Sequence, residues 1–265
     1  MHDSLVVWER QTSLESLRRH FEVAVANARR SGRDGITVES FRSRLDENLT
    51  FISDRLRRLD YRFSAYGQKL ISRGAHRTPR EISVPTVRDR VALRAMTVAL
   101  NELDQSLRIE LPQSKVARLI AALERGSECF VQLDVRDFYP SIDHELLQNN
   151  LRQFMDERMA SIYMAASSTP TLGIQKRSGH ETRAVGVPQG LAISNGLAEL
   201  AMRDVDRVGS EGSYFRYVDD IVLLGDAREL PAQARRVRAA LRRAGLEVHG
   251  EDSSKSGIWV NSGGV

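Results

Sequence analysis

The sequence predicts an α+β fold, with helices concentrated in the first half of the chain and antiparallel strands in the second. Apolar residues recur every three or four positions in 13–30 and in 37–59, and this spacing predicts two amphipathic helices. The segments 214–217 and 221–224 are instead short runs of aromatic and β-branched residues, which predict a β-hairpin. With 265 residues and 41% hydrophobic content, the chain can form one large domain or two smaller domains that share a core.

Composition excludes several classes of protein. The sequence has no run of 18 or more apolar residues, and its first residues lack the pattern of a signal peptide, so we expect a cytoplasmic protein without membrane contact. Cys129 is the single cysteine, which excludes an internal disulfide and a cysteine-based zinc cluster. The net charge is +4, and all but four of the basic side chains are arginines. This balance favours a polyanionic partner.

The first half of the chain predicts a helical region followed by a basic hairpin. Glycines at 32 and 35 end the first helix, and Thr37 opens the second. Short strands are expected at 61–63, 68–72 and 80–85, so residues 69–85 form a hairpin. Arg73, Arg77 and Arg80 lie on or near its tip, and for a basic hairpin taken alone a solvated loop is the simpler interpretation. A helix starts at 88–90, and Pro112 is expected to break the helix and connector over 103–126.

The second half of the chain predicts a strand that carries a carboxylate and the elements around it. Residues 130–135 are expected to form a strand, in which Asp134 follows three apolar positions. Asp143 is expected to cap the helix that follows it. The remaining expected elements are a glycine-bracketed loop at 184–190, a helix with small residues at 194–208, a basic helix at 232–244, and short strands at 246–248 and 258–260.

Two adjacent carboxylates, Asp219 and Asp220, stand between the two strands of the C-terminal hairpin. Burial of one carboxylate is costly, and burial of two neighbours costs more unless a cation compensates their charge. A metal site at the hairpin tip would resolve this conflict. A solvated Asp-Asp turn is the alternative, because aspartate is common in turns. The hairpin taken by itself is compatible with both.

Four motifs occur in the order found in the fingers and palm of reverse transcriptases, and the resemblance covers most of the chain. Two further segments, Gly32–Thr37 and Arg80–Val91, are similar to the bacterial branch of that family, which includes group II intron, retron and defence-associated enzymes. The four motifs are Leu133–Tyr139, Val187–Gly190 with Ser194, the Tyr-X-Asp-Asp box Tyr217–Asp220, and the region Gly245–Lys255.

The resemblance implies a right-hand polymerase architecture, with an antiparallel palm sheet packed on helices. It assigns residues 1–127 to the fingers and 128–265 to the palm, with about 145–185 returning to the fingers. Relatives continue past the last palm strand into a helical thumb, and we expect this chain to lack one. A partner protein, an oligomer or a structured non-coding RNA would then take over the thumb's role.

The implied reaction is RNA-directed DNA synthesis, in which a 3′-hydroxyl attacks the α-phosphate of a dNTP and pyrophosphate leaves. Family resemblance assigns two Mg²⁺ ions to this chemistry, with Mn²⁺ as a possible substitute. Asp134 and Asp219 would bridge the ions, Asp220 would be a secondary ligand, and the carbonyl of Val135 would complete one metal sphere. Lys255 is a candidate to protonate pyrophosphate, with a solvated lysine as the alternative.

Further residues are assigned to the nucleotide by the same resemblance. Tyr139 lies where the family places an aromatic ring beneath the incoming sugar, and such a ring excludes a ribose 2′-hydroxyl by collision. Gln189 would contact the nucleotide. Arg73 and Arg80 resemble the basic pair that binds the triphosphate. We therefore expect dNTPs, an RNA template and a DNA product as partners. The alternative for Tyr139 is a plain core residue.

Other functions stay open at this level. An untemplated or protein-primed DNA polymerase could use the same palm, with Tyr61, Tyr66, Tyr163 or Tyr214 as a hydroxyl for priming. A group II intron or retron-type mobile-element enzyme is a second alternative. Asn195 stands after Ser194, where intron enzymes usually have proline, and this favours a role in antiphage defence. A nucleic-acid-binding subunit with a vestigial palm is an alternative of a different class.

Overall fold

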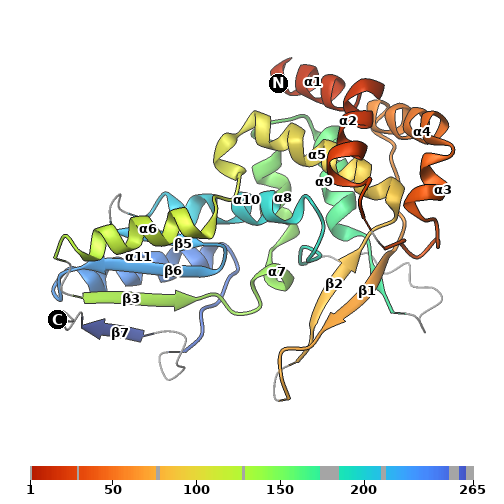
Figure 1. The fold of residues 1–265 in the computed structure, drawn as a ribbon. Helices are drawn as coiled ribbons and strands as arrows, with labels where there is room; N and C mark the ends of the chain where they lie inside the picture. The colour runs from red at the N-terminus through yellow and green to blue at the C-terminus, as the bar shows by residue number, and fades with distance from the viewer. Residues whose placement is uncertain are drawn as a thin grey trace.

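The computed structural model describes residues 2–28, 30–75, 78–126, 129–173, 185–209, 213–250 and 257–260. Figure 1 shows two lobes, a helical lobe built mainly from the first half of the chain and a sheet-containing lobe built mainly from the second. One hydrophobic core includes residues of both lobes, from Trp8 to Leu246. Within the described ranges, no helix is long and apolar enough to cross a membrane.

The helical lobe is organised around α5 (Val87–Leu103), which is buried along most of its length. Thr86 caps α5 by accepting a hydrogen bond from the amide of Asp89. Tyr163 joins a second helix to α5, because its hydroxyl donates to the carbonyl of Met96 (3.0 Å). The other helices of this lobe are α1 (His2–Gln11), α2 (Leu14–Ala24), α3 (Val38–Arg42), α4 (Leu45–Arg57) and α9 (Glu157–Ser168), which carries Tyr163.

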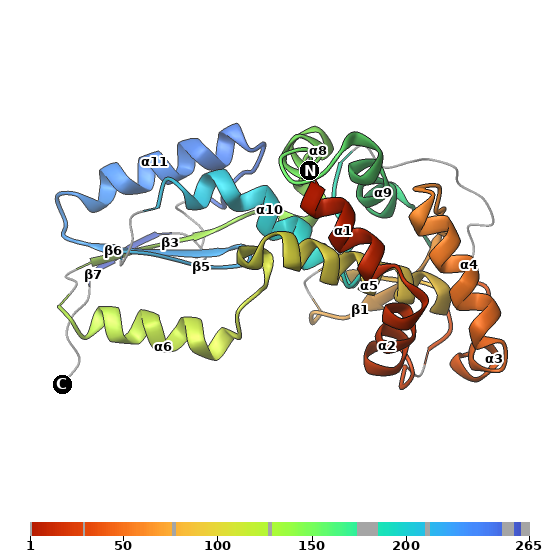
Figure 2. The ribbon, with the colours of Figure 1, turned by 90° about the horizontal axis from the view of Figure 1, so that it is seen from above.

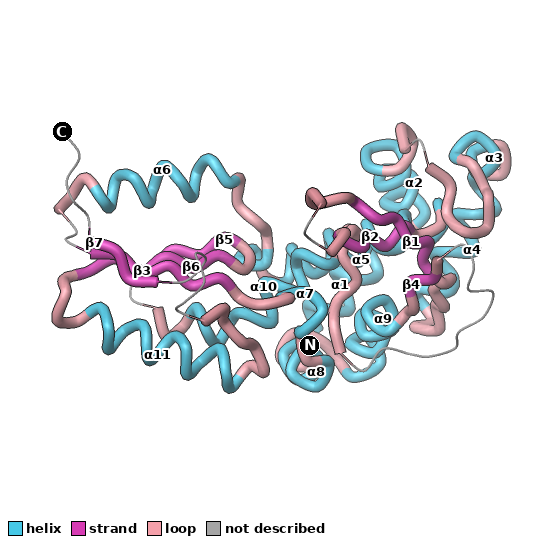
Figure 3. Tube along the Cα trace, turned by 90° about the horizontal axis from the view of Figure 1, so that it is seen from below, coloured by secondary structure: helices cyan, strands magenta, loops and turns pink. Residues whose placement is uncertain are grey.

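A small sheet extends from the helical lobe. The strands β1 (Tyr66–Ile71) and β2 (Arg80–Val84) form the predicted antiparallel hairpin. A third strand, β4 (Thr171–Leu172), pairs in parallel with β1 (Figure 3). The chain thus returns to the helical lobe after the first strand of the larger sheet. Of the predicted return over about 145–185, residues 174–184 lie outside the described ranges, and the domain boundaries remain predictions.

The second lobe contains a four-stranded antiparallel sheet in the order β5-β6-β3-β7. The helices α10 (Ser194–Asp206) and α11 (Leu230–Arg243) cover one face, and α6 (Pro112–Leu123) lies on the other (Figure 2). The strands are β3 (Cys129–Asp134), β5 (Tyr214–Tyr217), β6 (Asp220–Gly225) and β7 (Gly257–Val260), and three short helices, η1 (Gln105–Leu107), α7 (Phe138–Ser141) and α8 (His144–Leu151), connect the lobes. The predicted α+β class with an antiparallel sheet packed on helices is confirmed.

Several expected elements differ from those observed. Helix α1 was not predicted, and the expected helix over 37–59 is divided into α3 and α4 at Ser43 and Arg44. Residues 61–63 are not a strand, because Tyr61 instead turns into the core and donates a hydrogen bond to buried Asp89 (2.8 Å). Pro112 begins α6 instead of breaking a helix, since proline lacks only an amide that the first turn leaves unpaired. The expected strand 246–248 is a single bridge from Val248 to Val135.

Candidate active site

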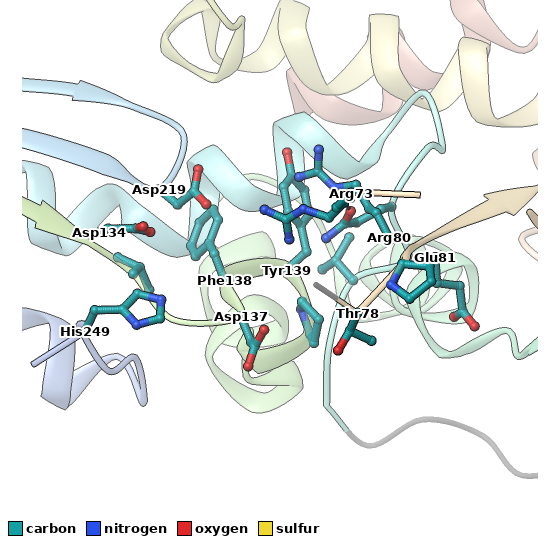
Figure 4. Close-up of a pocket in the computed structure, with 15 residues that line it drawn as sticks. Arg73, Thr78, Arg80, Glu81, Asp134, Asp137, Phe138, Tyr139, Asp219 and His249 are labelled. Carbon is teal, nitrogen blue, oxygen red and sulfur yellow. Dashed lines mark hydrogen bonds between the residues drawn. The ribbon is translucent and has the colours of Figure 1, made fainter. Parts of the chain in front are cut away.

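A cavity of about 320 Å³ lies between the end of the larger sheet and the β1–β2 hairpin (Figure 4). Most of the predicted site residues meet there, although they come from distant parts of the sequence. The predicted residues that line it are Arg73, Arg80, Asp134, Val135, Tyr139, Gln189 and Asp219. Asp220 does not line it, and Lys255 lies outside the described residues.

The larger sheet brings Asp134 and Asp219 to the same end. Asp134 is the last residue of β3, and Asp219 lies in the turn that enters β6, the strand paired with β3. The amide of Val135 donates to the carbonyl of Asp219 (3.2 Å), so the two segments stay joined beyond the strands. On the other side, the amide of His249 donates to the carbonyl of Asp134 (3.0 Å). Backbone hydrogen bonds therefore join the end of β3 to the Asp219 turn on one side and to the His249 segment on the other.

The turn that carries Asp219 is strained. Tyr217 pairs with Asp220, which leaves Val218 and Asp219 as a two-residue hairpin loop. Val218 has a φ of 59°, a left-handed conformation that is rare for a β-branched residue. Such a conformation costs about 1–3 kcal/mol and persists only where the surroundings impose it. This turn places the Asp219 side chain at the cavity.

Arg216 supplies part of that constraint from beneath the turn. Its side chain is only 4% exposed, and its guanidinium bonds to Glu199 (2.7 Å), to Asp206 (2.6 Å) and to the carbonyl of Val218 (3.0 Å). Lys115 of α6 donates to the carbonyl of Arg216 (2.9 Å). Burial would lower the pKa of Arg216, but the two carboxylates outweigh it and raise the pKa above its usual value. The charged arginine thus links the Asp219 turn to α10.

The donors at this end of the cavity fit a magnesium site. Mg²⁺ prefers oxygen ligands and is commonly held by one or two carboxylates together with substrate phosphates. Asp134 and Asp219 supply two carboxylates to one cavity. Among the residues that the structure describes, no group of three His, Cys, Asp or Glu side chains is arranged to hold a metal ion. Asp220, predicted as a secondary ligand, is exposed and lies opposite Asp134 in the strand pairing.

Tyr139 forms part of the cavity wall between the aspartates and the hairpin arginines. Its hydroxyl donates to Oδ1 of Asn195 at the start of α10 (2.8 Å), which fixes the ring from its far end. Burial raises the pKa of Tyr139 to about 12, and the negative charge of Asp219 adds to the effect. The ring packs edge-on against Phe138, with centroids 5.4 Å apart. Tyr139 is therefore neutral, held in one place and partly open to the cavity.

Gln189 connects the loop before α10 to the β1–β2 hairpin. Its side-chain oxygen accepts a hydrogen bond from Nε of Arg80 (2.6 Å), and its carbonyl accepts one from the amide of Ser83 (2.7 Å). Gly190 permits the close approach of the loop to the hairpin. A Cβ at that position would lie 2.5 Å from Cγ2 of Ile82, and its φ of 97° also favours glycine. The loop before α10 and the hairpin are therefore one unit.

Charge is unevenly distributed along the cavity. Figure 4 shows Asp134 and Asp219 toward one end and Arg73 and Arg80 toward the other, with Tyr139 between them. Arg73 follows β1 and Arg80 begins β2, so both arginines come from the hairpin as predicted; Arg77 lies outside the described residues. A ligand with a polyanionic end and a metal-binding portion would match this arrangement.

Sequence reasoning missed three ionisable residues of the cavity: Asp137, Glu81 and His249. Asp137 stands in a left-handed conformation (φ 44°) before α7, which an aspartate tolerates better than most residues. Its position three residues after Asp134 was a usable signal. His249 had no such signal, because backbone contacts with residues about 115 positions earlier, including the bond to Asp134, bring it to the site.

Comparisons with known proteins agree with this geometry. The family model described as reverse transcriptase (RNA-dependent DNA polymerase) matches residues 72–256. Among solved structures, apo telomerase from Candida Tropicalis, truncated from its C-terminal domain, is similar with a TM-score of 0.54 and 13% sequence identity. The match covers 76% of this chain and 51% of the telomerase chain, so this chain spans about half of it. No curated protein matches the chain. The structural likeness establishes the fingers–palm fold.

Proposed function

Because the chain belongs to the reverse transcriptase family, whose model matches residues 72–256, we propose that it is an RNA-directed DNA polymerase. It adds dNTPs to a 3′-hydroxyl on an RNA template and produces DNA. The observation that carries the proposal is the single cavity that joins Asp134 and Asp219 to Tyr139, Gln189 and the hairpin arginines. A metal-binding end, a sugar-sized wall and a cationic end match the three parts of a nucleoside triphosphate.

In the proposed mechanism, the hairpin arginines bind the triphosphate. Guanidinium groups form paired hydrogen bonds with phosphate oxygens, so Arg73 and Arg80 suit this role. Arg80 already donates to Gln189, and this bond holds it in the cavity before a nucleotide arrives. Gln189 would then contact the same nucleotide. The arginine end of the cavity therefore orients the α-phosphate toward the two aspartates.

At the other end, Asp134 and Asp219 would hold two Mg²⁺ ions, or Mn²⁺, with the carbonyl of Val135 as a further ligand. When bound, such ions activate the attacking hydroxyl and stabilise the leaving oxygen. The strained turn at Val218 and the backbone bonds of Asp134 and Asp219 keep both carboxylates in position. No free energy is therefore needed to reorganise them during the reaction. Asp220 would add negative charge to the site from outside the cavity. Lys255 would protonate pyrophosphate.

Tyr139 would select the sugar. Its ring is buried, and its hydroxyl is fixed by Asn195, so the ring cannot easily move aside for a ribose 2′-hydroxyl. We expect Tyr139→Ala to reduce discrimination against NTPs by at least tenfold, measured as the ratio of kcat/KM values for dNTP and NTP. Tyr139→Phe keeps the ring and loses only the hydroxyl bond to Asn195, so it should lose less discrimination than Tyr139→Ala. Unchanged selectivity in Tyr139→Ala would assign this residue to the core.

Primer extension with the purified chain, Mg²⁺ and dNTPs tests the activity, with and without template RNA. Template-dependent incorporation is the expected result. Asp219→Asn keeps the shape of the side chain and removes its charge, so incorporation should fall by at least a hundredfold because one metal ligand is weakened. Incorporation that persists without template would contradict RNA direction. Full activity of Asp219→Asn would contradict the metal assignment, and no activity in any condition would support a vestigial subunit.

The four tyrosines named from the sequence give little support to protein-primed synthesis, because their hydroxyls are already engaged. Tyr61, Tyr66 and Tyr163 are buried, and their hydroxyls donate to Asp89, the carbonyl of Ala166 and the carbonyl of Met96. Burial raises the pKa of each of the three hydroxyls above the usual value. A buried, neutral hydroxyl is a poor nucleophile. The hydroxyl of Tyr214 donates to Asp206 in the Arg216 cluster and is likewise engaged.

The biological role that we propose is antiphage defence in bacteria. Its support is the resemblance of residues 32–37 and 80–91 to the bacterial branch, together with Asn195 after Ser194. A host that expresses the chain in its native operon should resist phage infection, and Asp219→Asn should abolish this resistance. Protection that survives this substitution would contradict a role for DNA synthesis. Mobility of a linked intron or retron in the same assay strain would support the mobile-element alternative.

A further inference from the structure

The outer face of α11 carries a dense cluster of arginines that the proposed catalysis does not use. Over its 14 residues α11 contains five arginines and no acidic residue. Its buried residues, which include Val237 and Leu241, pack toward the larger sheet. Four of the five arginines, Arg235, Arg236, Arg242 and Arg243, are exposed, as is Arg228 just before the helix. We call these five exposed residues, 228, 235, 236, 242 and 243, the α11 arginine surface.

The arginines of this surface form two rows with a floor of small residues between them. Positions seven apart lie nearly above one another on a helix. Arg228, Arg235 and Arg242 therefore form one row, and Arg236 and Arg243 form a second. Ala232 and Ala239 lie between the rows, and they line an open hollow together with Arg228, Glu229, Arg235 and Arg236. The helix is about 21 Å long at 1.5 Å per residue.

The positive charge of this surface exceeds that of the carboxylates beside it, Asp226 and Glu229. In the described part of the chain, no salt bridge joins any of the five arginines to a carboxylate; other exposed arginines, such as Arg18 and Arg44, do form such pairs. Glu229 is the acidic residue at the hollow, and Asp226 directs its side chain to the amides of Arg228 and Glu229 (both 2.8 Å). The α11 arginine surface is thus a concentrated source of positive charge without a salt-bridge partner among the described residues.

The chemistry of the surface favours the backbone of a nucleic-acid duplex as its partner. A protein partner would require apolar anchors, but none of the large exposed hydrophobic side chains among the described residues lies between 228 and 243. Single strands are bound largely by stacking on aromatic rings, and this segment has no aromatic residue. Rows of arginines without either feature suit contacts to phosphates, which carry affinity without sequence preference.

We propose that the α11 arginine surface is a second nucleic-acid binding site, which holds the phosphate backbone of a duplex outside the catalytic cavity. No residue of α11 lines that cavity, and α11 lies on the face of the sheet opposite α6 (Figure 2). The small side chains of Ala232 and Ala239 let a backbone enter between the two arginine rows. RNA and DNA duplexes present the same phosphates, so the test includes both.

The test measures binding of the purified full chain to a labelled 20-base-pair RNA duplex and to a DNA duplex of the same sequence, over a range of salt concentrations. One variant replaces Arg228, Arg235, Arg236, Arg242 and Arg243 with glutamine. The matched control replaces five exposed arginines of α2 and α4 and the segment between them, Arg18, Arg19, Arg44, Arg55 and Arg57. A third variant, Ala239→Glu, puts one carboxylate on the floor between the rows and favours helix. Melting temperatures verify that all three fold.

We expect the α11 variant to bind at least tenfold more weakly near 100 mM salt, with the control within about threefold of the wild type. Each lost phosphate contact should flatten the slope of log K against log salt by about 0.9. Ala239→Glu should weaken binding by about threefold or more. Equal binding by wild type and the α11 variant, or an equal loss in the control, overturns the proposal. Retained duplex binding with loss of a copurifying acidic protein also overturns it. Because no step requires catalysis, failure here is separate from failure of the proposed polymerase activity.

Discussion

At the scale of single residues, two hydrogen bonds explain how the candidate site is held, and both were invisible in the sequence. Asn195 accepts the hydroxyl of Tyr139, and Arg216 donates to the carbonyl of Val218. The first bond gives a physical reason for a side chain with an acceptor oxygen at position 195. The second stabilises a left-handed valine beside Asp219. Each bond gives a prediction that can be tested separately from the metal ligands.

Asn195→Ala should reduce sugar selectivity without removing the ring of Tyr139. Loss of one hydrogen bond is worth about 0.5–1.5 kcal/mol, so discrimination between dNTP and NTP should fall by about two- to tenfold. The measurement is the ratio of kcat/KM values in single-nucleotide incorporation. Tyr139→Phe removes the other partner of the same bond, and the double variant should be no worse than the worse of the two single variants. Additive losses would show that Asn195 does not act through Tyr139.

Arg216→Gln should destabilise the protein strongly. The substitution leaves Glu199 and Asp206 without their buried cation, and breaking such a pair costs about 3–5 kcal/mol. Arg207→Gln is the matched control, because Arg207 pairs with Asp204 on the surface and such pairs are worth about 0–1 kcal/mol. The free energy of unfolding in urea measures both. A loss below about 1 kcal/mol for Arg216→Gln would mean that the cluster does not support the Asp219 turn.

At the scale of secondary-structure elements, the β1–β2 hairpin and the loop before α10 behave as one unit because Gly190 lets them meet. Gly190→Ala should disturb this contact twice. Its added Cβ would collide with Ile82, and its positive φ would be strained. We expect a loss of stability above about 2 kcal/mol and a higher KM for dNTP, because the bond between Arg80 and Gln189 is displaced.

Gly245→Ala provides the control for this prediction. Gly245 also has a positive φ, of 74°, but among the described residues no atom beyond its two chain neighbours lies within 4 Å of the position that its Cβ would take. This variant therefore reports backbone strain without collision, and it should leave the KM for dNTP unchanged. Equal effects of the two variants on stability and on KM would show that strain alone matters, and that the contact between the hairpin and the loop is unimportant.

The elements themselves were largely predictable from local sequence, because their signals are local. The caps at Thr37 and Asp143 each accept the expected hydrogen bond, and both hairpins pair as the alternation of side chains predicts. The misses have tertiary causes. Helix α1 depends on Trp8, whose ring donates to the carbonyl of Leu56 in another helix (3.1 Å). His249 and Asn195 reach the site through contacts between distant segments, for which a single sequence holds no signal.

At the scale of the whole molecule, the two lobes share one core across the junction of α5 and α10. Leu100 of α5 is fully buried, and its Cδ2 would lie 3.3 Å from a Cβ placed on Gly196 of α10. Glycine at 196 therefore allows the two helices to approach closely. Since the carboxylates belong to one lobe and the arginines Arg73 and Arg80 to the other, the geometry of the cavity depends on this junction.

The shared core predicts that both lobes unfold together, and the two tryptophans of the chain allow a direct measurement. Trp8 lies in α1 of the helical lobe, and Trp259 lies in β7 of the larger sheet. The variants Trp259→Phe and Trp8→Phe each leave one fluorescent probe. Circular dichroism of each variant measures how much the substitution itself changes the urea midpoint. After correction for this change, the two fluorescence midpoints should coincide. Leu100→Ala, which should cost about 2–5 kcal/mol as a buried truncation, should shift both midpoints together. A shift at one tryptophan alone would mean that the lobes are independent, and that the distance between the aspartates and the hairpin arginines is set by the bound substrate.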